Sequence, residues 1–207
     1  MRPYQRLVSK TNGKEIMLFP LEILHITQGE GGSYSHAGTY NMDFVGVTTH
    51  APIYAPCSCT CVDTIAGTNN GRVFESIAPV NLANGTIGFV TFAILHDENP
   101  IASIGDVFIQ GSLIGHTGQA GQVTGDHVHL NTAYGTYQGV EYVPPDNQQQ
   151  LVNSSHIYET CYINNTLIVE PLSYTWVTYQ NGVSPSMYKG YRFKWVLYAR
   201  KLRDRFN

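Results

Sequence analysis

Short apolar stretches bounded by turn-forming residues recur along most of the chain. They cover residues 16–26, 44–47, 72–80 and 86–96, with a turn signal at Asn84-Gly85. Runs of this length with such boundaries are typical of strands. A long amphipathic helical pattern is missing from the sequence. The pattern therefore predicts an all-β fold with many turns.

The pattern changes after Tyr142. Val143-Pro144-Pro145-Asp146 and the glutamines at 148–150 are typical of a linker or domain edge. Beyond them, residues 162–169, 174–179 and 188–198 are expected to form strands. We therefore expect a domain at 1–142, with its core at about 19–132, and a β-rich C-terminal extension at 143–207. The extension is either an added sheet or an aromatic, basic docking surface.

Composition and charge limit the size of the domain and the classes of binding partner. The 207 residues suffice for one full domain with a buried core, and the formal net charge is -3. Between Glu15 and Tyr188 the only basic residue is Arg72, whereas seven basic residues crowd the end of the chain. An acidic body argues against nucleic-acid binding, although the tail alone suits a polyanion.

Targeting signals are not visible in the sequence. The N-terminal residues 1–7 are polar and lack the apolar region of a secretory signal. The most apolar stretch, Ile87–Leu95, is too short to span a membrane. If the protein acts outside a cell, we expect release by lysis or delivery on an assembled particle.

Three of the four cysteines alternate at Cys57, Cys59 and Cys61, and Cys161 stands alone. Alternate residues of one strand share a face and point in parallel, which suits neither a disulfide nor a thiolate zinc site. The row therefore predicts small packing residues in a reduced protein.

The most informative stretch is Gly125-Asp126-His127-Val128-His129-Leu130. Histidines at i and i+2 of a strand share a face, roughly 6–7 Å apart. One imidazole can then hold a metal while the other reaches a water on it, although two half-exposed strand histidines are the simpler alternative. A catalytic zinc needs three protein ligands and an open position. His36, in the glycine-rich loop at 28–40, and Asp43 would complete a set with His127 or His129.

Further short motifs surround these residues in a fixed order. The order is Ile26-Thr27-Gln28-Gly29, Ser35-His36-Ala37-Gly38, Asp43, Pro52-Ile53-Tyr54-Ala55-Pro56, Leu95-His96, Gly105-Asp106-Val107, Gly111-Ser112-Leu113-Ile114-Gly115, Gly118 and Gly125-Asp126-His127-Val128-His129-Leu130. Over residues 19–132 this succession resembles the lysostaphin-type (LytM-like) zinc endopeptidases, which cut peptide bonds in bacterial peptidoglycan.

The resemblance implies an antiparallel β fold with its site in a groove walled by loops. It implies that His36, Asp43 and His129 bind Zn²⁺, and that His127 and His96 form the catalytic pair that activates water and steadies the oxyanion. Six residues separate His36 from Asp43, where the family usually has three. The longer loop is similar to hydrolases on the tail tips of small phages. This second resemblance implies a virion location in the phage tail, with tail proteins as partners. The family resemblance implies a peptidoglycan peptide as substrate.

Two other interpretations remain open. A catalytically inactive domain of this type would serve as a structural or wall-binding tail component. A cupin-like metal barrel also uses a His-x-His strand but needs a glutamate soon after it, and the first one here is Glu141. The remaining histidines, His25, His50, His116 and His156, are expected to be structural.

Overall fold

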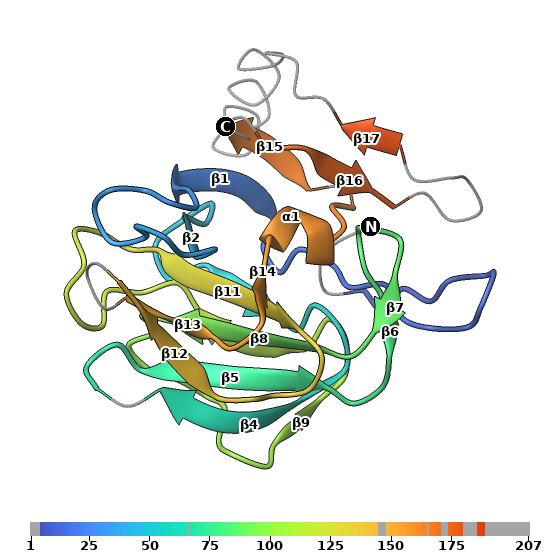
Figure 1. Cartoon of the computed structure of the whole chain (residues 1–207), viewed down its shortest axis with the longest axis horizontal. Coiled ribbons are helices and arrows are strands. Elements are labelled where there is room, and N and C mark those ends of the chain that lie inside the picture. The colour runs from blue at the N-terminus through green and yellow to red at the C-terminus, as the bar shows by residue number, and fades with distance from the viewer. Residues whose placement is uncertain are drawn as a thin grey trace, which may run out of the picture.

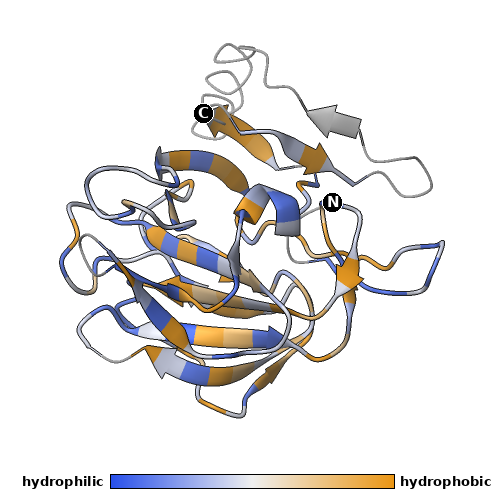
Figure 2. Ribbon diagram, viewed as in Figure 1, coloured by the Kyte–Doolittle hydropathy of each residue, from blue (hydrophilic) through white to orange (hydrophobic). Residues whose placement is uncertain are grey.

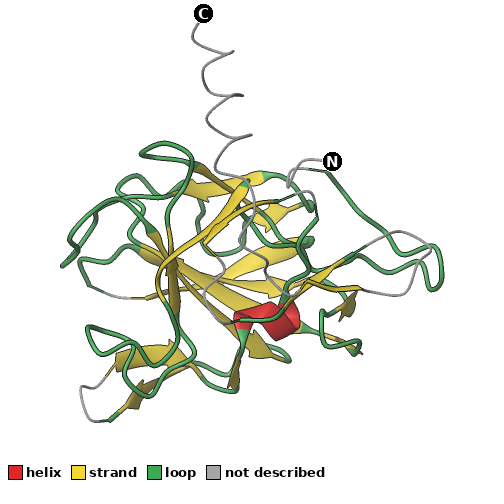
Figure 3. Cartoon of the chain, turned by 90° about the horizontal axis from the view of Figure 1, so that it is seen from above, coloured by secondary structure: helices red, strands yellow, loops and turns green. Residues whose placement is uncertain are grey.

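The computed structural model describes residues 5–65, 67–144, 148–164, 166–170, 174–179 and 186–188. These residues form seventeen strands and one helix of four residues, α1 (Ile157–Thr160). Figure 3 shows the strands running through the middle of the molecule, with loops around them. The predicted all-β class is confirmed.

A nine-stranded sheet forms the body of the molecule (Figure 1). Its pairings are antiparallel except between β1 and β15, so the expected antiparallel arrangement is also confirmed. In spatial order its strands are β15 (Leu167–Glu170), β1 (Ile23–Gln28), β2 (Met42–Phe44), β11 (Val128–Tyr134), β8 (Val90–Leu95), β5 (Gly71–Ser76), β4 (Cys59–Ile65) and β9 (Val107–Phe108), with β14 (Ser154–Ser155) paired to β11.

Four two-stranded ribbons surround the sheet. They are β10 (Leu113–His116) with β3 (Pro52–Tyr54), β12 (Val140–Val143) with β13 (Gln148–Leu151), β16 (Trp176–Thr178) with β17 (Ser186–Tyr188), and β6 (Val80–Asn81) with β7 (Ile87–Gly88). The predicted Asn84-Gly85 turn closes the last ribbon, and Gly85 takes the positive φ of 86° that such a turn requires. The strand predicted at 16–26 forms only in part. Its regular portion begins at Ile23, whereas Ile16 and Leu18 form isolated bridges with Asn81 and Tyr162.

Side chains of the central strands alternate between two apolar clusters on opposite faces of the sheet. Figure 2 shows hydrophobic and hydrophilic bands along several of the strands. All six residues of β8 are buried, with Phe92 and Ile94 in the large core and Ala93 and Leu95 in a smaller cluster on the other face. Along β11, Val128 and Leu130 likewise enter the large core. The period of two therefore turns His129 to the face opposite that core.

Several described residues after position 143 pack onto the same sheet. Trp176 is fully buried in the large core, with its ring centroid 5.5 Å from that of Phe19 and 6.4 Å from that of Phe44. The division into units at 1–142 and 143–207, and the docking role of the second, stay predictions. Most of the predicted strand at 188–198 lies outside the described residues.

The cysteine prediction is confirmed. All four cysteines are buried and free, and they belong to the large core. Burial raises the pKa of the Cys59 and Cys161 thiols. Among the described residues, no helix is long and apolar enough to cross a membrane.

Candidate metal centre

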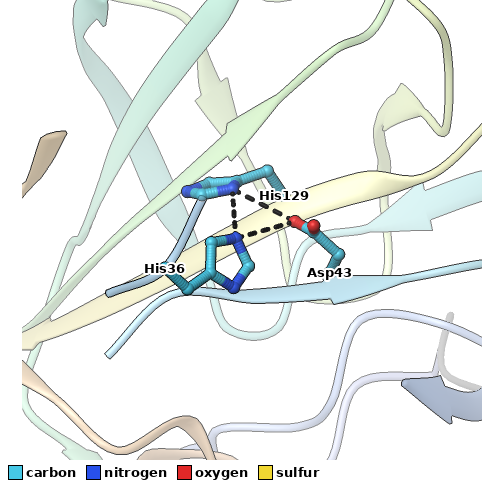
Figure 4. Close-up of side chains that lie close together, drawn as sticks. All are labelled: His36, Asp43 and His129. Carbon is cyan, nitrogen blue, oxygen red and sulfur yellow. Dashed lines mark hydrogen bonds and ion pairs between the residues drawn. The ribbon is translucent and has the colours of Figure 1, made fainter. Parts of the chain in front are cut away.

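The strand register brings two of the predicted ligands together. Asp43 is the middle residue of β2 and lies directly opposite His129 of the neighbouring antiparallel strand β11. Directly opposed residues project from one face with Cβ atoms about 5 Å apart. His36 reaches the same point from the loop between β1 and β2, and Figure 4 shows the three side chains pointing toward one another.

The distances between the ligand atoms fit a tetrahedral zinc ion. Asp43 Oδ1 lies 3.2 Å from His36 Nε2 and 3.1 Å from His129 Nδ1, and the two nitrogens are 3.2 Å apart. Ligands about 2.0–2.1 Å from a tetrahedral metal would be separated by about 3.3 Å. Among the described residues, these three side chains form the one group of His, Cys, Asp and Glu close enough to hold a metal ion.

The protonation states also suit a cation. The Nδ1 of fully buried His36 lies 3.2 Å from the Gly29 carbonyl oxygen, which can only accept, so Nδ1 carries a proton and Nε2 would present its lone pair to a metal. Burial by itself would raise the pKa of Asp43, but the adjacent His129 and His36 side chains outweigh it and hold that pKa below its ordinary value. Burial lowers the pKa of His129. Neutral imidazoles and an ionised carboxylate are the forms that bind zinc.

His127 and His96 lie beside this group without belonging to it. His127 Nε2 is 3.7 Å from Asp43 Oδ1, and the His96 ring centroid is 4.7 Å from that of His127. Their Nδ1 atoms each lie 2.8 Å from a backbone carbonyl oxygen, that of Gly125 for His127 and that of Ala120 for His96. In the neutral form both imidazoles therefore present an Nε2 lone pair, which is the arrangement of a proton acceptor.

His96 is held in an uncommon backbone conformation just after β8. Its φ is 81°, a left-handed value that costs free energy in residues other than glycine. Its backbone N–H donates to Asn69 at 2.7 Å, and its carbonyl accepts from the Ala120 N–H at 3.0 Å. These contacts hold the residue against the strain and turn its ring toward His127.

One short segment, residues 118–120, connects the two imidazoles. Gly118 exchanges two backbone hydrogen bonds with His127, of 3.0 and 3.1 Å, and Ala120 is bonded to His96 through both backbone and ring. Gly118 belongs to the order of motifs that carries the family resemblance, whereas Ala120 does not. Both residues act through backbone atoms, so residue type alone does not predict their contacts with the two histidines.

Replacing Gly118 with alanine is expected to lower turnover by about 100-fold with zinc retained, since a misplacement of about 1 Å can cost that much. A Cβ at Gly118 would lie 2.2 Å from the His96 carbonyl oxygen, so the backbone must move. Kinetics and zinc content measure the effect. Gly88→Ala, in β7 and away from the site, is the matched control, because a Cβ there meets nothing within 4 Å. Equal turnover in the two variants would contradict the supporting role of the segment.

Acidification is expected to destabilise the metal-free protein. Burial lowers the pKa of His96 from 6.5 to about 4 in the folded chain. Between these values the unfolded chain binds a proton that the folded chain does not, so the free energy of unfolding falls as the pH falls. The loss due to His96 is at most about 3 kcal/mol, at roughly 1.4 kcal/mol per pKa unit. Denaturant titrations in the presence of chelator, at several pH values between 4 and 6.5, measure the free energy of unfolding. We expect this free energy to depend less steeply on pH in His96→Asn than in the wild-type chain.

The structure thus brings all five predicted site residues together, and their individual roles stay predictions. The other histidines lie apart from the group: His50 pairs with Glu98 at 3.3 Å, and His156 with Glu30 at 2.6 Å. His116, at the end of β10, has its Nδ1 4.0 Å from Asp97 Oδ2. A small pocket adjoins His129 between the sheet and β13, with Ala93, Leu95, Asn131 and Gln150 among its lining residues.

Comparisons with known proteins place the chain beside a phage protein. No family model matches it. Morphogenesis protein 1 of Bacillus phage B103 is 40% identical over 170 residues, which are 81% of this chain and 46% of that protein. The chain therefore spans about half the length of this curated relative.

Solved structures similar to the chain include two peptidases. The catalytic domain of the antimicrobial peptidase lysostaphin from Staphylococcus simulans is 19% identical, with a TM-score of 0.41 over 54% of this chain and 79% of that chain. A zinc-containing peptidase from Vibrio cholerae is 15% identical, with a TM-score of 0.42 over 72% of this chain and 46% of that chain. Lysostaphin-type peptidases are thus among the solved structures that this all-β chain is similar to.

Proposed function

We propose that this chain is a zinc metalloendopeptidase that hydrolyses stem or cross-bridge peptide bonds of bacterial peptidoglycan. The observation that carries the proposal is the convergence of His36 Nε2, Asp43 Oδ1 and His129 Nδ1 beside two imidazoles with free Nε2 atoms. Three protein ligands with an open fourth position characterise catalytic zinc sites. The order of motifs along the sequence, which resembles lysostaphin-type endopeptidases, supports peptidoglycan as the substrate.

The three converging side chains would hold the metal. Zinc bound there supplies an activated water at neutral pH and polarises the scissile carbonyl group. His36 and Asp43 are buried and His129 is half-buried, so few waters compete at the site and electrostatic interactions with the substrate are stronger there.

His127 is suited to proton transfer. Its Nε2 faces the ligand group, and the hydrogen bond to the Gly125 carbonyl keeps the proton on Nδ1. It can accept a proton at Nε2 as the nucleophile forms and deliver that proton to the leaving amine. General acid–base catalysis of this kind contributes about 10²–10⁴-fold.

The contact that His96 can make with the oxyanion depends on the protonation state of its imidazole. Its Nδ1–H is engaged by the Ala120 carbonyl, so neutral His96 has no proton to donate from Nε2. It then accepts a hydrogen bond from the attacking water. It donates to the tetrahedral oxyanion only when Nε2 is protonated, and burial, which lowers the pKa of His96 to about 4, makes that form scarce at neutral pH. Loss of one such donor typically costs about 3 kcal/mol.

A virion location is part of the proposal. The similarity to a protein named for phage morphogenesis supports it. The longer loop between His36 and Asp43, which resembles tail-tip hydrolases, supports a place in the phage tail with tail proteins as partners. The host cell wall would then be the site of action.

Release of free amines from purified Gram-positive peptidoglycan tests the function. We expect release with zinc, none after chelation, and recovery when zinc is restored. Absence of release under all three conditions, in a protein shown to bind zinc, would contradict the proposed activity. It would favour the inactive tail component, an alternative that the complete set of five side chains does not favour.

Removal of residues 188–207 is expected to spare hydrolysis of soluble peptides and to weaken attachment to the wall or particle several-fold, because electrostatic attraction to anionic polymers depends on local charge. This segment carries seven of the twelve basic residues. Co-sedimentation with peptidoglycan at low and high salt measures attachment. Equal sedimentation of the full and shortened chains would remove the docking role.

A further inference from the structure

The loop that carries His36 is fastened to the last third of the chain. At its far end, the Tyr40 backbone N–H donates to the Gln150 side chain at 3.4 Å, and the Asn41 side chain donates to the Gln149 carbonyl at 2.9 Å. At its near end, Glu30 Oε2 accepts a hydrogen bond from His156 Nδ1 at 2.6 Å. Residues far apart in the sequence thus hold both ends of one loop.

The near-end contact lies next to the group that orients His36. The His36 Nδ1–H donates to the carbonyl of Gly29, the residue before Glu30. The Tyr174 hydroxyl packs so closely on Gly29 that a Cβ there would lie 2.2 Å from it. A shift of Glu30 would therefore move the carbonyl that sets the His36 ring.

His156 in turn is anchored to the strand of another ligand. It directly follows β14, whose Ser155 pairs with Thr132 of β11, the strand that carries His129. Rings pack on both sides of His156: Tyr40 at 4.6 Å and Tyr158 at 4.8 Å between centroids. The Glu30–His156 pair is thus a connection between the supports of the two histidine ligands.

The pair is poorly explained as a source of stability alone. The Glu30 side chain is only 10% exposed, and burial raises the pKa of its carboxyl group although the His156 hydrogen bond opposes this. A buried ion pair gains little net stability, because desolvation offsets the attraction. Orientation of metal ligands by groups outside the ligand set is a well-attested use of such contacts.

We propose that Glu30 and His156 are positioning residues for His36 and set the metal affinity of the centre. The proposal rests on the zinc site proposed above. Loss of the pair would let the loop at 29–41 open at its near end. Zinc would then bind less tightly because the ordering of His36 must accompany binding.

The test measures zinc affinity by competition with a chromophoric chelator, in full-length variants whose metal-free forms are first shown to be folded. We expect Glu30→Ala and His156→Phe to weaken zinc binding by about 10–100-fold, the usual effect of losing such a partner. His156→Phe keeps an aromatic ring between Tyr40 and Tyr158 but lacks the donor. Glu30→Gln keeps an acceptor for His156 and is expected to bind zinc nearly as wild type. Glu22→Ala, at an exposed acid, is the matched control.

Hydrogen exchange gives a readout without metal. Amides at 29–41 are expected to exchange faster in metal-free Glu30→Ala and not in Glu22→Ala. Wild-type zinc affinity in folded Glu30→Ala or His156→Phe would overturn the proposal, and so would global unfolding of both, since the pair would then support the fold as a whole. A wild-type chain that binds no zinc overturns both proposals, whereas one that binds zinc without hydrolysis overturns only the function.

Discussion

His129→Ala is expected to abolish both zinc binding and hydrolysis. The Nδ1 of His129 lies 3.1 Å from Asp43 Oδ1 and 3.2 Å from His36 Nε2, so its loss leaves two of the three ligands. Loss of a hydrogen-bond partner outside the ligand set typically weakens metal binding by about 10–100-fold. Loss of a ligand itself is expected to weaken binding more than that. Zinc content after dialysis and peptide hydrolysis are the two measurements.

The control for this substitution is His116→Ala. His116 lies at the end of β10, and its side chain is 34% exposed, outside the ligand group. We expect wild-type zinc content and turnover in that variant. A folded His129→Ala chain that still holds one equivalent of zinc would show that His129 is not a ligand.

His127→Ala is expected to keep zinc and to lose turnover by about 10²–10⁴-fold, the usual contribution of a general acid–base group. His127 Nε2 lies near the ligand group, 3.7 Å from Asp43 Oδ1, but is not one of its three converging atoms. The backbone of His127 stays paired with Gly118 after truncation of the ring. Steady-state kinetics on a soluble peptide measure turnover, and the zinc content of the purified variant measures metal binding.

The two variants form a matched pair. Both remove an imidazole from the same side of one chain segment, two residues apart, so a difference between them reflects role rather than chemistry. Zinc loss in His127→Ala would assign it to the ligand set instead. Retained hydrolysis in His127→Ala would exclude it as the proton-transfer group.

Much of the site could be predicted because strand periodicity is local. Alternation predicted that His127 and His129 share a face, and the structure turns His129 away from the large core, whereas Val128 and Leu130 enter it. The choice between His127 and His129 as ligand came from the resemblance, not from the spacing. The register of β2 on β11, which sets Asp43 directly opposite His129, agrees with that choice.

The supports of the site could not be predicted, because they are backbone groups or distant partners. The carbonyls of Gly29, Gly125 and Ala120 hold three of the imidazoles, and any residue type offers a carbonyl. Glu30 and His156 are 126 positions apart and neither carries a motif. His156 was expected to be structural, whereas its contact with Glu30 is the basis of the positioning role proposed above.

The sequence by itself determined the strand-rich class and the packing role of the alternating cysteines, because these depend on residue type and on spacing within one segment. It also supplied five candidate site residues, whose individual roles stay predictions. Only the tertiary structure decided how the groups meet. The register of β2 on β11 places Asp43 opposite His129. Long-range contacts such as that of Glu30 with His156 hold the loop that carries His36. A left-handed backbone conformation orients the His96 ring. Each of these depends on pairing between segments distant in the chain, whose free energy is distributed over the whole fold and leaves no local signal.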